Sequence, residues 1–413
     1  MTTFYELYHK LVKDAVDRKE FDEKEYCDYD KGHLDCLLHP KKHPLVWHIG
    51  KCECTDEQKQ VCAKNCPFDA VEKTNEGENK INAEKCTGCS FCVDNCKAQN
   101  LVASKDAVAV LKEIQNKDKL IYALIAPAFL GQFSDEVTPG KLRSALKKVG
   151  FDGMIEVSLF ADILTLKEAL EFMQNIKTDK DYQLTSCCCP IWIAMIRKQF
   201  ADLLEHVPSS VSPMVAGGRV VKQLYPDAIT VFIGPCVAKK AEAREADIKD
   251  AIDYVLTFEE ANDIFKAMDI NPADMEESVK DHSSRAGRIY ARTGGVSEAV
   301  KATMQKLRPE HPIHMRTAQA DGVKYCREMV EEIASGKIKA NFYEGMGCIG
   351  GCAGGPKSII GAAEATENVN RYADSAAYAT PIDNLYVIEL LNKIGFDTVE
   401  SLLEDNEIFT RKF

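Results

Sequence analysis

The sequence predicts an α/β protein of more than one domain, in which a small cysteine-rich part precedes a larger part. The chain has 413 residues, of which 45% are hydrophobic, and this is enough to bury more than one core. Ten of the 17 cysteines lie before residue 97, in short clusters. From about residue 108 onward, apolar runs typical of buried strands alternate with longer amphipathic stretches. Alternating strands and helices favour a layered α/β architecture.

Four apolar runs of the larger part are predicted to be strands. Pro127 ends the first run, and Gly234 with Pro235 ends the third. Helical spacing predicts a helix over 161–175, and a capping box formed by Thr257 and Glu260 predicts the start of another. The four predicted strands cover residues 120–127, 153–158, 228–233 and 254–256.

The charge of the chain excludes some classes of partner. The formal net charge is -12, whereas nucleic acids and anionic membranes both attract basic surfaces. We therefore expect neither nucleic acid nor a membrane as a partner. The first residues lack the charged and apolar regions of a secretory signal, and the longest uncharged stretches, 120–134 and 182–196, are too short to cross a bilayer. Clustered cysteines in odd number then indicate reduced thiols in a cytoplasmic protein.

A run of four cysteines with the spacing C-x2-C-x2-C-x3-C extends over residues 86–96. Three thiolates on such a loop can bind one iron-sulfur cubane, and the fourth then binds a neighbouring cluster. A second, degenerate run lies upstream and ends in a Cys-Pro pair. Together the runs resemble a bacterial-type ferredoxin with two 4Fe-4S clusters, and a zinc knuckle or a disulfide loop is the alternative. The predicted ligands are Cys52, Cys54, Cys62, Cys66, Cys86, Cys89, Cys92 and Cys96, with Cys66 serving the second cluster and Cys96 the first.

The segment before these runs is also rich in possible metal ligands. Cysteine and histidine at this density suit zinc or a further cluster. We favour the alternative, a helix-and-loop extension over residues 1–50 in which the histidines pack or face water. The residues concerned are Cys27, His33, Cys36, His39, His43 and His48.

Four more cysteines, Cys189, Cys236, Cys348 and Cys352, lie far apart in the larger part. Pro127 and the first three of these cysteines each follow an expected strand, and loops at the carboxyl ends of parallel strands converge. Glycines around Cys348 and Cys352 let the backbone approach a bulky group. Four thiolates from separate loops can hold an iron-sulfur cluster, and scattered buried cysteines are the alternative.

The residues around these cysteines resemble the three signature segments of iron-only (FeFe) hydrogenases. The matching segments are Thr185–Trp192, Pro235–Glu242 and Glu344–Cys352, and Ala126–Ala128 resembles an earlier loop of the family. The resemblance covers nearly the whole chain beyond residue 50. It implies a hydrogenase-type α/β catalytic domain over 107–413, with two α/β lobes around the cofactor. A small α+β ferredoxin-like domain over 51–106 would precede it.

The resemblance also implies an H-cluster, which is a 4Fe-4S cluster joined to a di-iron centre with carbonyl, cyanide and azadithiolate ligands. Cys189, Cys236, Cys348 and Cys352 would bind the 4Fe-4S cluster, and Cys352 would also bridge to the di-iron centre. Lys239 would face a cyanide, where an ammonium stabilises negative charge. The protein would position this cofactor and exclude water from it. The remaining residues that the resemblance places around the cofactor are Met346, Ala126, Pro127 and Pro235.

Proton transfer in the family implies a chain of side chains from the cofactor to water. Cys188 matches the family's proton-transfer cysteine, and Glu168 and Glu171 resemble its relay glutamates. Pro208 replaces the relay serine, unless Ser209 substitutes for it. Further departures from the family are Gly234 in place of a methionine, Met214 in place of a glutamine, the additional thiol of Cys187 and the altered segment 354–357.

Three functions are compatible with these residues. The first is reversible oxidation of H2 to protons and electrons, slowed by the altered surroundings of the cofactor, with electrons passing through the ferredoxin-like clusters to a ferredoxin-like electron carrier. The second is H2 or redox sensing through a regulatory partner protein. The third is a non-catalytic role in iron-sulfur assembly, against which the Cys188 thiol argues. We expect the first, with sensing as the alternative, and we expect Cys326 to be a small buried hydrophobe.

Overall fold

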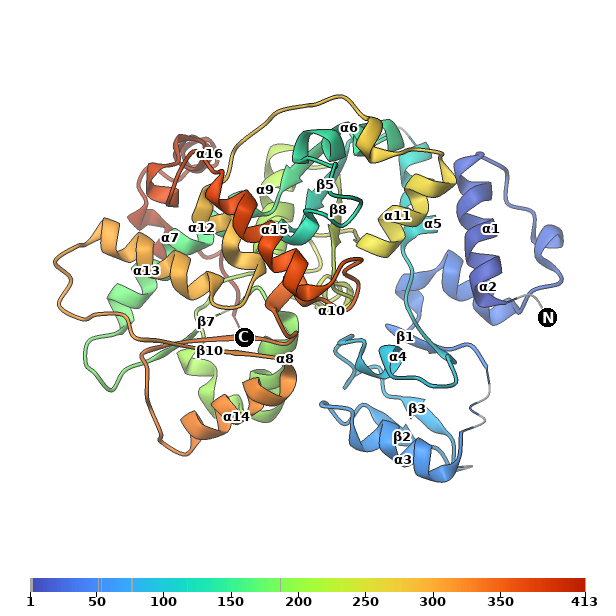
Figure 1. Cartoon of the computed structure of the whole chain (residues 1–413), viewed down its shortest axis with the longest axis horizontal. Coiled ribbons are helices and arrows are strands. Elements are labelled where there is room, and N and C mark those ends of the chain that lie inside the picture. Colours follow the sequence, from blue (N-terminus) through green and yellow to red (C-terminus); the bar gives the residue numbers. More distant parts are fainter. Residues whose placement is uncertain are drawn as a thin grey trace.

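The computed structural model describes residues 3–50, 52, 54–75, 77–116, 118–185 and 187–412, so Ser186 of the first signature segment lies outside the described residues. The larger part of the chain contains two parallel sheets, whose labelled strands can be found in Figure 1. The first sheet has the strand order β6-β5-β8-β9, and the second has the order β10-β11-β7. The strands are β5 (Ile121–Ile125), β6 (Gly153–Glu156), β7 (Gln183–Thr185), β8 (Ile229–Gly234), β9 (Tyr254–Thr257), β10 (Thr317–Asp321) and β11 (Phe342–Met346).

The four predicted strands are confirmed, and together they form the first sheet. Ala123 of β5 pairs with Met154 of β6 on one side and with Val231 of β8 on the other. The predicted capping box is also confirmed, because the Glu260 N–H donates to Thr257 Oγ1 over 3.1 Å and the Thr257 N–H donates to Glu260 Oε2 over 2.9 Å. Around this sheet lie the helices α6 (Pro139–Val149), α9 (Pro213–Leu224), α10 (Ala238–Glu242) and α11 (Phe258–Ala267).

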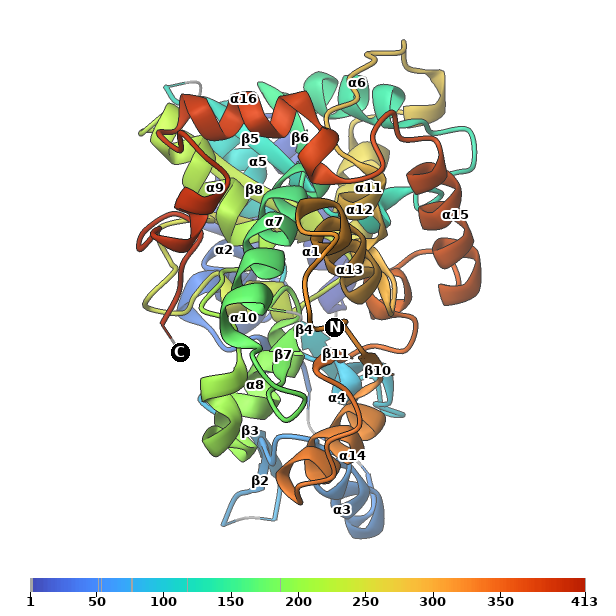
Figure 2. The same cartoon turned by 90° about the vertical axis from the view of Figure 1, so that its left-hand side faces the viewer.

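Helix α7 (Ser158–Asn175) lies in the interior of the larger part and confirms the helix predicted over 161–175. It packs against α9 beside the first sheet and against α13 (Gly295–Leu307) beside the second. In the view of Figure 2, α7 runs between α9 and α13. Every residue from 158 to 172 is buried, so this helix has no solvent-facing side over most of its length. The carboxylates that it carries are therefore interior groups.

The second sheet packs against α8 (Pro190–Gln199) and α14 (Val323–Ala334). Trp192 of α8 is fully buried, and its Nε1–H donates to the carbonyl of Thr185 over 2.7 Å. A Cβ on Gly345 of β11 would lie 2.1 Å from the Trp192 ring, so no larger side chain fits there. The signature segments containing Trp192 and Gly345 are thus packed directly on each other.

The N-terminal part joins the cysteine-rich region by strand pairing. Trp47 of β1 pairs with Val102 of β4, although the predicted boundary at residue 50 lies between these two strands. Helix α1 packs against α5 and α11, so it docks on the larger part, as Figure 1 also shows. The elements are α1 (Phe4–Val16), α2 (Lys31–Leu38), β1 (Val46–His48), α3 (Asp56–Lys64), β2 (Val71–Lys73), β3 (Asn79–Ile81), α4 (Phe91–Asp94), β4 (Leu101–Ala103) and α5 (Ala107–Gln115).

The C-terminal segment covers the larger part from outside. The Val211 N–H donates to the carbonyl of Phe409 over 3.0 Å, which attaches the end of the chain to the segment before α9. In the ranges that the structure describes, no helix is long and apolar enough to span a membrane. The remaining α-helices are α12 (Arg285–Arg288), α15 (Ala362–Asp374) and α16 (Leu385–Lys393), and the short 3-10 helices are η1 (Glu23–Tyr26), η2 (Pro40–Lys42), η3 (Pro127–Phe129), η4 (Ala201–His206), η5 (Pro272–Asp274), η6 (Ile289–Ala291), η7 (Gly351–Gly354), η8 (Pro381–Asp383) and η9 (Glu400–Leu403).

Candidate active site

The structure brings Cys189, Cys236, Cys348 and Cys352 together from three separate loops. Cys189 precedes α8, Cys236 follows β8, Cys348 follows β11, and Cys352 lies in η7. Burial and the nearby Cys352 and Cys189 raise the pKa of Cys236 to about 12, and burial with the nearby Cys189 raises the pKa of Cys352 to about 11. The expected convergence of loops at strand ends therefore occurs, and it places four thiols within one another's electric field.

The chemistry of this set of cysteines fits an iron-sulfur cluster. Buried thiols without a metal remain protonated, and bound iron is what stabilises them as thiolates. The Gly347 N–H donates to Cys189 Sγ over 3.2 Å, a contact that favours negative charge on the sulfur. Gly350 and Gly351 have φ values of +81° and +73°, which glycine adopts without strain, and the chain turns sharply there between Cys348 and Cys352.

The predicted residues Ala126, Pro127 and Pro235 lie at the carboxyl edge of the first sheet, after β5 and β8. A Cβ on Gly234 would lie 3.0 Å from the Cβ of Ala126, so the two loops are in contact. The same Cβ would lie 2.7 Å from the Phe232 ring. The Phe232 ring therefore occupies space beside Gly234, at the position where the resemblance led us to expect a methionine.

Met346 and Cys326 are neighbours in the core of the second sheet. Met346 ends β11 and is buried in the same core as Cys188 and Cys189. Cys326 Sγ donates to the carbonyl of Met346 over 3.2 Å and is itself fully buried. The interpretation of Cys326 as a small buried side chain is confirmed, and Met346 lies beside the cysteine loops as the resemblance implied.

Two adjacent lysines of α10 are both buried and contact different neighbours. Lys239 Nζ donates to Glu242 Oε2 over 2.6 Å, and Cys188 and Cys236 lie close enough to favour its charge. Burial by itself lowers the pKa of Lys239, but these neighbours raise it above its usual value. Lys240 Nζ instead donates over 2.6 Å to a backbone carbonyl of β9. Of the two lysines, Lys239 is the one beside the cysteine loops.

Glu168 is buried on α7 and is contacted by two side chains of the first cysteine loop. Thr185 Oγ1 donates to Glu168 Oε2, and Cys187 Sγ donates to Glu168 Oε1 over 3.4 Å. Burial, reinforced by the charge of Glu171, raises the pKa of Glu168 to about 7, so this carboxyl exchanges its proton near neutral pH. Cys188 lies within the electric field of Glu168. The direct contact to the carboxyl nevertheless comes from Cys187, a residue to which the sequence assigned no role.

The second glutamate, Glu171, belongs to a buried contact of three side chains. Lys167 Nζ donates to Glu171 Oε1 and, over 3.1 Å, to Ser210 Oγ, which in turn donates to Glu171 Oε2 over 3.4 Å. Pro208 is buried and Ser209 is exposed, so Ser209 does not fill the place of the relay serine; Ser210 points inward instead. The spacing of Lys167 and Glu171, four residues apart on a helix, was a signal for their ion pair, whereas no sequence signal marked Ser210.

Two cavities of the cysteine-rich part are lined by cysteines. Cys66, Cys86, Cys89 and Cys92 line one cavity. Cys52, Cys54, Cys62 and Cys96 line the other, together with Cys92, which borders both. The fourth cysteine of each run thus lies with the other run, which is the exchange that the ferredoxin resemblance implied. The Ala70 N–H donates to Cys66 Sγ over 3.3 Å, and the buried Ser90 hydroxyl beside this cavity has no partner among the described residues. Such donors near sulfur suit thiolates that bind a cluster.

The cavity lined by Cys66, Cys86, Cys89 and Cys92 adjoins the cysteine site of the larger part. A Cβ on Gly88 would lie 3.2 Å from the Cα of Ala238, so this cysteine loop rests on the start of α10. The pKa of Cys348 is raised by burial, by the other three cysteines of its site and also by Cys89. The two four-cysteine sites are therefore close neighbours.

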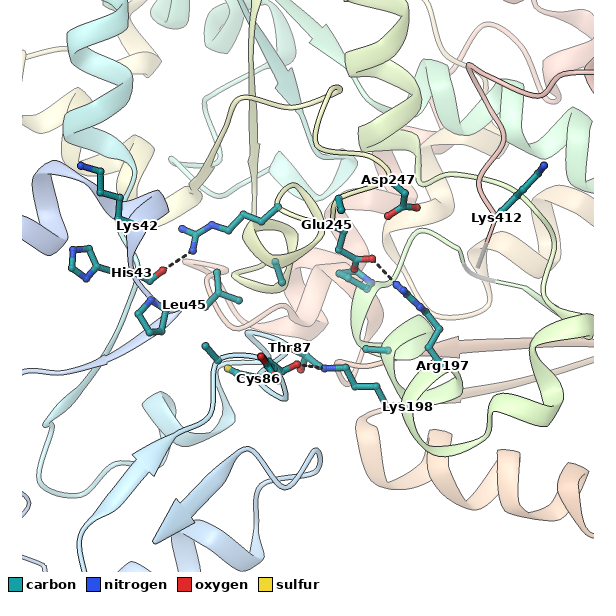
Figure 3. A pocket seen from close by; sticks show the side chains of 18 residues that line it. Lys42, His43, Leu45, Cys86, Thr87, Arg197, Lys198, Glu245, Asp247 and Lys412 are labelled. Carbon is teal, nitrogen blue, oxygen red and sulfur yellow. Dashed lines mark hydrogen bonds and ion pairs between the residues drawn. The ribbon is translucent and has the colours of Figure 1, made fainter. Parts of the chain in front are cut away.

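A cavity of about 940 Å³ opens where the N-terminal segment, the cysteine-rich part and the larger part meet (Figure 3). Lys198 Nζ donates to the carbonyl of Glu84 over 2.9 Å and to that of Lys85 over 3.1 Å. Arg244 donates to the carbonyl of His43 over 2.9 Å. Cations of the larger part thus bind the backbone of the two preceding parts. Other charged residues around this cavity are Lys42, Arg197, Glu245, Asp247 and Lys412.

Histidines of the predicted N-terminal extension make ordinary packing and polar contacts. The His33 ring packs edge-on against Phe4 with the ring centroids 5.5 Å apart, and His43 Nε2 lies 2.7 Å from Asp35 Oδ2. Cys27 is exposed. Among residues 3–50, no His, Cys, Asp or Glu side chains form a group of three or more that could hold a metal ion.

Comparison with protein families defines the class of protein. The family "Iron only hydrogenase large subunit, C-terminal domain" matches residues 119–356, which is more than half of the chain and includes all four cysteines of the site. The chain therefore belongs to the iron-only hydrogenase large-subunit family.

Curated relatives cover different shares of the chain. The NADP-reducing hydrogenase subunit HndD of Solidesulfovibrio fructosivorans is 27% identical over 79% of this chain and 66% of that protein. Iron hydrogenase 1 of Clostridium pasteurianum is 27% identical over 74% of this chain and 63% of that protein. The chain thus spans slightly less than two thirds of the length of these two relatives. The nuclear prelamin A recognition factor of Homo sapiens is 24% identical over 75% of this chain and 83% of that protein.

A solved structure shares the fold. The FeFe-hydrogenase HydA1 from Chlamydomonas reinhardtii aligns with a TM-score of 0.61 at 22% identity, over 75% of this chain and 98% of that chain. The expected hydrogenase-type catalytic fold, built on parallel α/β sheets, is thereby confirmed.

Proposed function

We propose that this chain catalyses the reversible oxidation of H2 to protons and electrons. The single observation that carries the proposal is the convergence of Cys189, Cys236, Cys348 and Cys352 at one buried site of a hydrogenase fold. Scattered structural cysteines have no reason to meet at the ends of three different strands. The presence of Lys239 and of the Cys188 thiol beside the same site supports a reactive centre.

The cofactor that we propose for this site is the H-cluster. Cys189, Cys236, Cys348 and Cys352 would hold its 4Fe-4S part, with Cys352 bridging to the di-iron part. When bound, this group supplies the metal chemistry that splits or forms H2. The protein contributes position and charge: the Lys239 ammonium is held in place by Glu242 and is available to an anionic cyanide ligand. Met346 and the loop residues Ala126, Pro127 and Pro235 would exclude water around the cofactor.

The proton route that we propose begins at the Cys188 thiol and continues through Glu168. A carboxyl with a pKa of about 7 can both accept and release a proton at neutral pH, which suits an intermediate station. The contact between Cys187 and Glu168 offers a second thiol on this route. Glu171, further along α7, would be the outer station.

The electron route that we propose runs through two 4Fe-4S clusters in a ferredoxin-like domain over 51–106, next to a catalytic domain over 107–413 and an extension over 1–50. Cys66, Cys86, Cys89 and Cys92 would bind the inner cluster, because Cys89 is a neighbour of Cys348. The other four cysteines would bind the outer cluster. A ferredoxin-type electron carrier is the expected external partner.

The test combines spectroscopy with an assay. The full chain is matured with the di-iron cofactor and examined by infrared spectroscopy for metal-bound carbonyl and cyanide, and H2 evolution is then measured. We expect these bands together with turnover, and we expect Cys188→Ala to keep the bands but lose turnover by about 100- to 10,000-fold. Absence of the bands would rule out the proposal. A Cys188→Ala variant with full turnover would rule out Cys188 as the proton carrier.

Sensing of H2 through a regulatory partner is the second candidate function. The observation that favours it is the Lys167–Glu171 ion pair on the outer part of the proton route, since a fixed ion pair slows proton transfer. Infrared bands with negligible turnover would support this alternative. A non-catalytic role in iron-sulfur assembly is the third candidate, and it predicts that the carbonyl and cyanide bands are absent.

A further inference from the structure

Lys167 is a buried cation in the interior of α7. Its side chain is 2% exposed, while that of Glu171 is 9% exposed. A lysine in such a place keeps its charge only if an anion or several polar groups compensate for the lost water. Glu171 and Ser210 provide this compensation, since Lys167 Nζ donates to both.

The Ser210 hydroxyl acts both as an acceptor and as a donor, in contacts with Lys167 and Glu171. Ser210 Oγ accepts from Lys167 over 3.1 Å and donates to Glu171 Oε2 over 3.4 Å. A hydroxyl passes a proton along a chain by accepting one proton while donating another. Here the accepting side faces an ammonium, which is a poor direction from which to receive an additional proton. The serine is thus held in one orientation by its neighbours.

The same cation acts on the carboxylate. A proton that moves from Glu168 to Glu171 approaches a fixed positive charge in an interior where charges are weakly screened. The electric field of Lys167 reaches Glu168 as well, where it favours the ionised carboxyl. The lysine therefore places a positive charge near both stations of the route.

We propose that Lys167 restricts proton passage between Glu168 and Glu171 by pairing with the Glu171 carboxylate and fixing the orientation of Ser210. Lys167 is a positioning residue in this role, because it touches neither the cofactor site nor H2. Protons cross only when the ion pair opens. The inference rests on the proton route of the proposed function, and it deepens that function by naming the element that limits the rate.

The test measures proton access without requiring H2 turnover. The full chain with its iron-sulfur clusters is diluted into D2O, and infrared spectroscopy follows the exchange of the Cys188 S–H group, assigned by its loss in Cys188→Ala. We expect Lys167→Met to exchange at least about tenfold faster than the unmodified chain. Lys167→Arg keeps the charge and should remain slow. Lys177→Met, at an exposed lysine just beyond α7, is the matched control and should exchange at the unmodified rate.

A second reading of the same spectra tests the ion pair itself. Lys167→Met should gain a carbonyl stretch of a protonated carboxylic acid at neutral pH, and this band should disappear in the double variant Lys167→Met/Glu171→Gln. Unchanged S–H exchange in Lys167→Met, or no difference in the carboxylic acid region between the single and the double variant, would overturn the inference. Lys167→Gln retains hydrogen bonds without charge and replaces Lys167→Met if the methionine variant fails to fold. Because neither reading uses H2, loss of hydrogenase activity would count against the proposed function alone.

Discussion

Replacing Lys240 with methionine is expected to destabilise severely the junction of α10 with α11 and with the start of α5. Lys240 Nζ is fully buried, lies 3.1 Å from Glu260 Oε2 and 3.4 Å from Asp106 Oδ1, and donates to the carbonyl of Val255 over 2.6 Å. Methionine matches the shape of the lysine stem but leaves two buried carboxylates without their cation. Removal of one partner from a buried ion pair costs about 3–5 kcal/mol.

The pKa of Glu260 determines at which pH the Lys240→Met substitution costs more stability. Burial raises the pKa of Glu260, but Lys240 and further contacts more than offset this and hold the pKa below its usual value of 4.5. The ionised Glu260 therefore adds stability that is present above about pH 4.5 and is lost as the pH falls through its lowered pKa. Without Lys240 the pKa of this carboxyl rises. The loss of stability in Lys240→Met should thus be largest near neutral pH and smaller at about pH 4.5.

The assay is urea denaturation followed by the fluorescence of the two tryptophans, Trp47 and Trp192, both of which are buried. Lys266→Met, at an exposed lysine of α11, is the matched control and should change the unfolding free energy by less than about 0.5 kcal/mol. The double variant Lys240→Met/Glu260→Gln should recover part of the loss. A change below about 1 kcal/mol in Lys240→Met, or an equal loss at both pH values, would refute the reasoning.

Three further predictions concern the candidate site. Glu168→Gln should remove a carboxylic acid infrared band that disappears as the pH rises through about 7, since burial raises the pKa of this group to about 7 and it is protonated below that pH. Cys348→Ser should lower the iron content of the anaerobically reconstituted chain, whereas Cys326→Ser, at a buried thiol outside the proposed ligand set, should not; equal iron in both variants would contradict the ligand assignment. Lys198→Gln should make the reduction potential of the cluster proposed near Cys86 more negative, because it removes a cation whose field reaches Cys86. A redox titration followed by electron paramagnetic resonance checks this, and an unchanged potential would argue against it.

Sequence spacing was sufficient to predict much of the first sheet. The strands β5, β6, β8 and β9 and the capping box at Thr257 are local patterns, in which apolar side chains and turn residues act within a few positions of one another. The strands of the second sheet were expected only as elements preceding Cys189 and Cys348, because β7 is short and their apolar runs are less distinct. The pairing of β1 with β4 across the predicted boundary at residue 50 depends on long-range contacts, which local patterns do not carry.

The cysteine ligand candidates followed from the sequence because their chemistry and spacing are distinctive. The directions in which individual side chains point did not follow from the sequence. Lys239 and Lys240 are adjacent in the sequence, yet one contacts Glu242 beside the cysteine loops and the other contacts β9. On α7, only the packing of the helix in the interior turns two glutamates into buried groups.

Cys187, the additional thiol of the first cysteine loop, shows most clearly what the sequence predicts and what only the tertiary structure decides. At the sequence level, the resemblance to the family, aligned on Cys189 and Pro190, implied roles for Cys188 and Cys189, and Cys187 acquired none. The tertiary structure turns Cys187 toward Glu168, and it turns Ser210 rather than Ser209 toward Glu171 and Lys167. Chain spacing determines which residues share a loop or a helix face, whereas packing between distant segments decides which of them meet and whether water reaches them. The proposed proton transfer depends on both, so the candidate ligand set could be predicted from the sequence, whereas the proposed route that serves it required the fold.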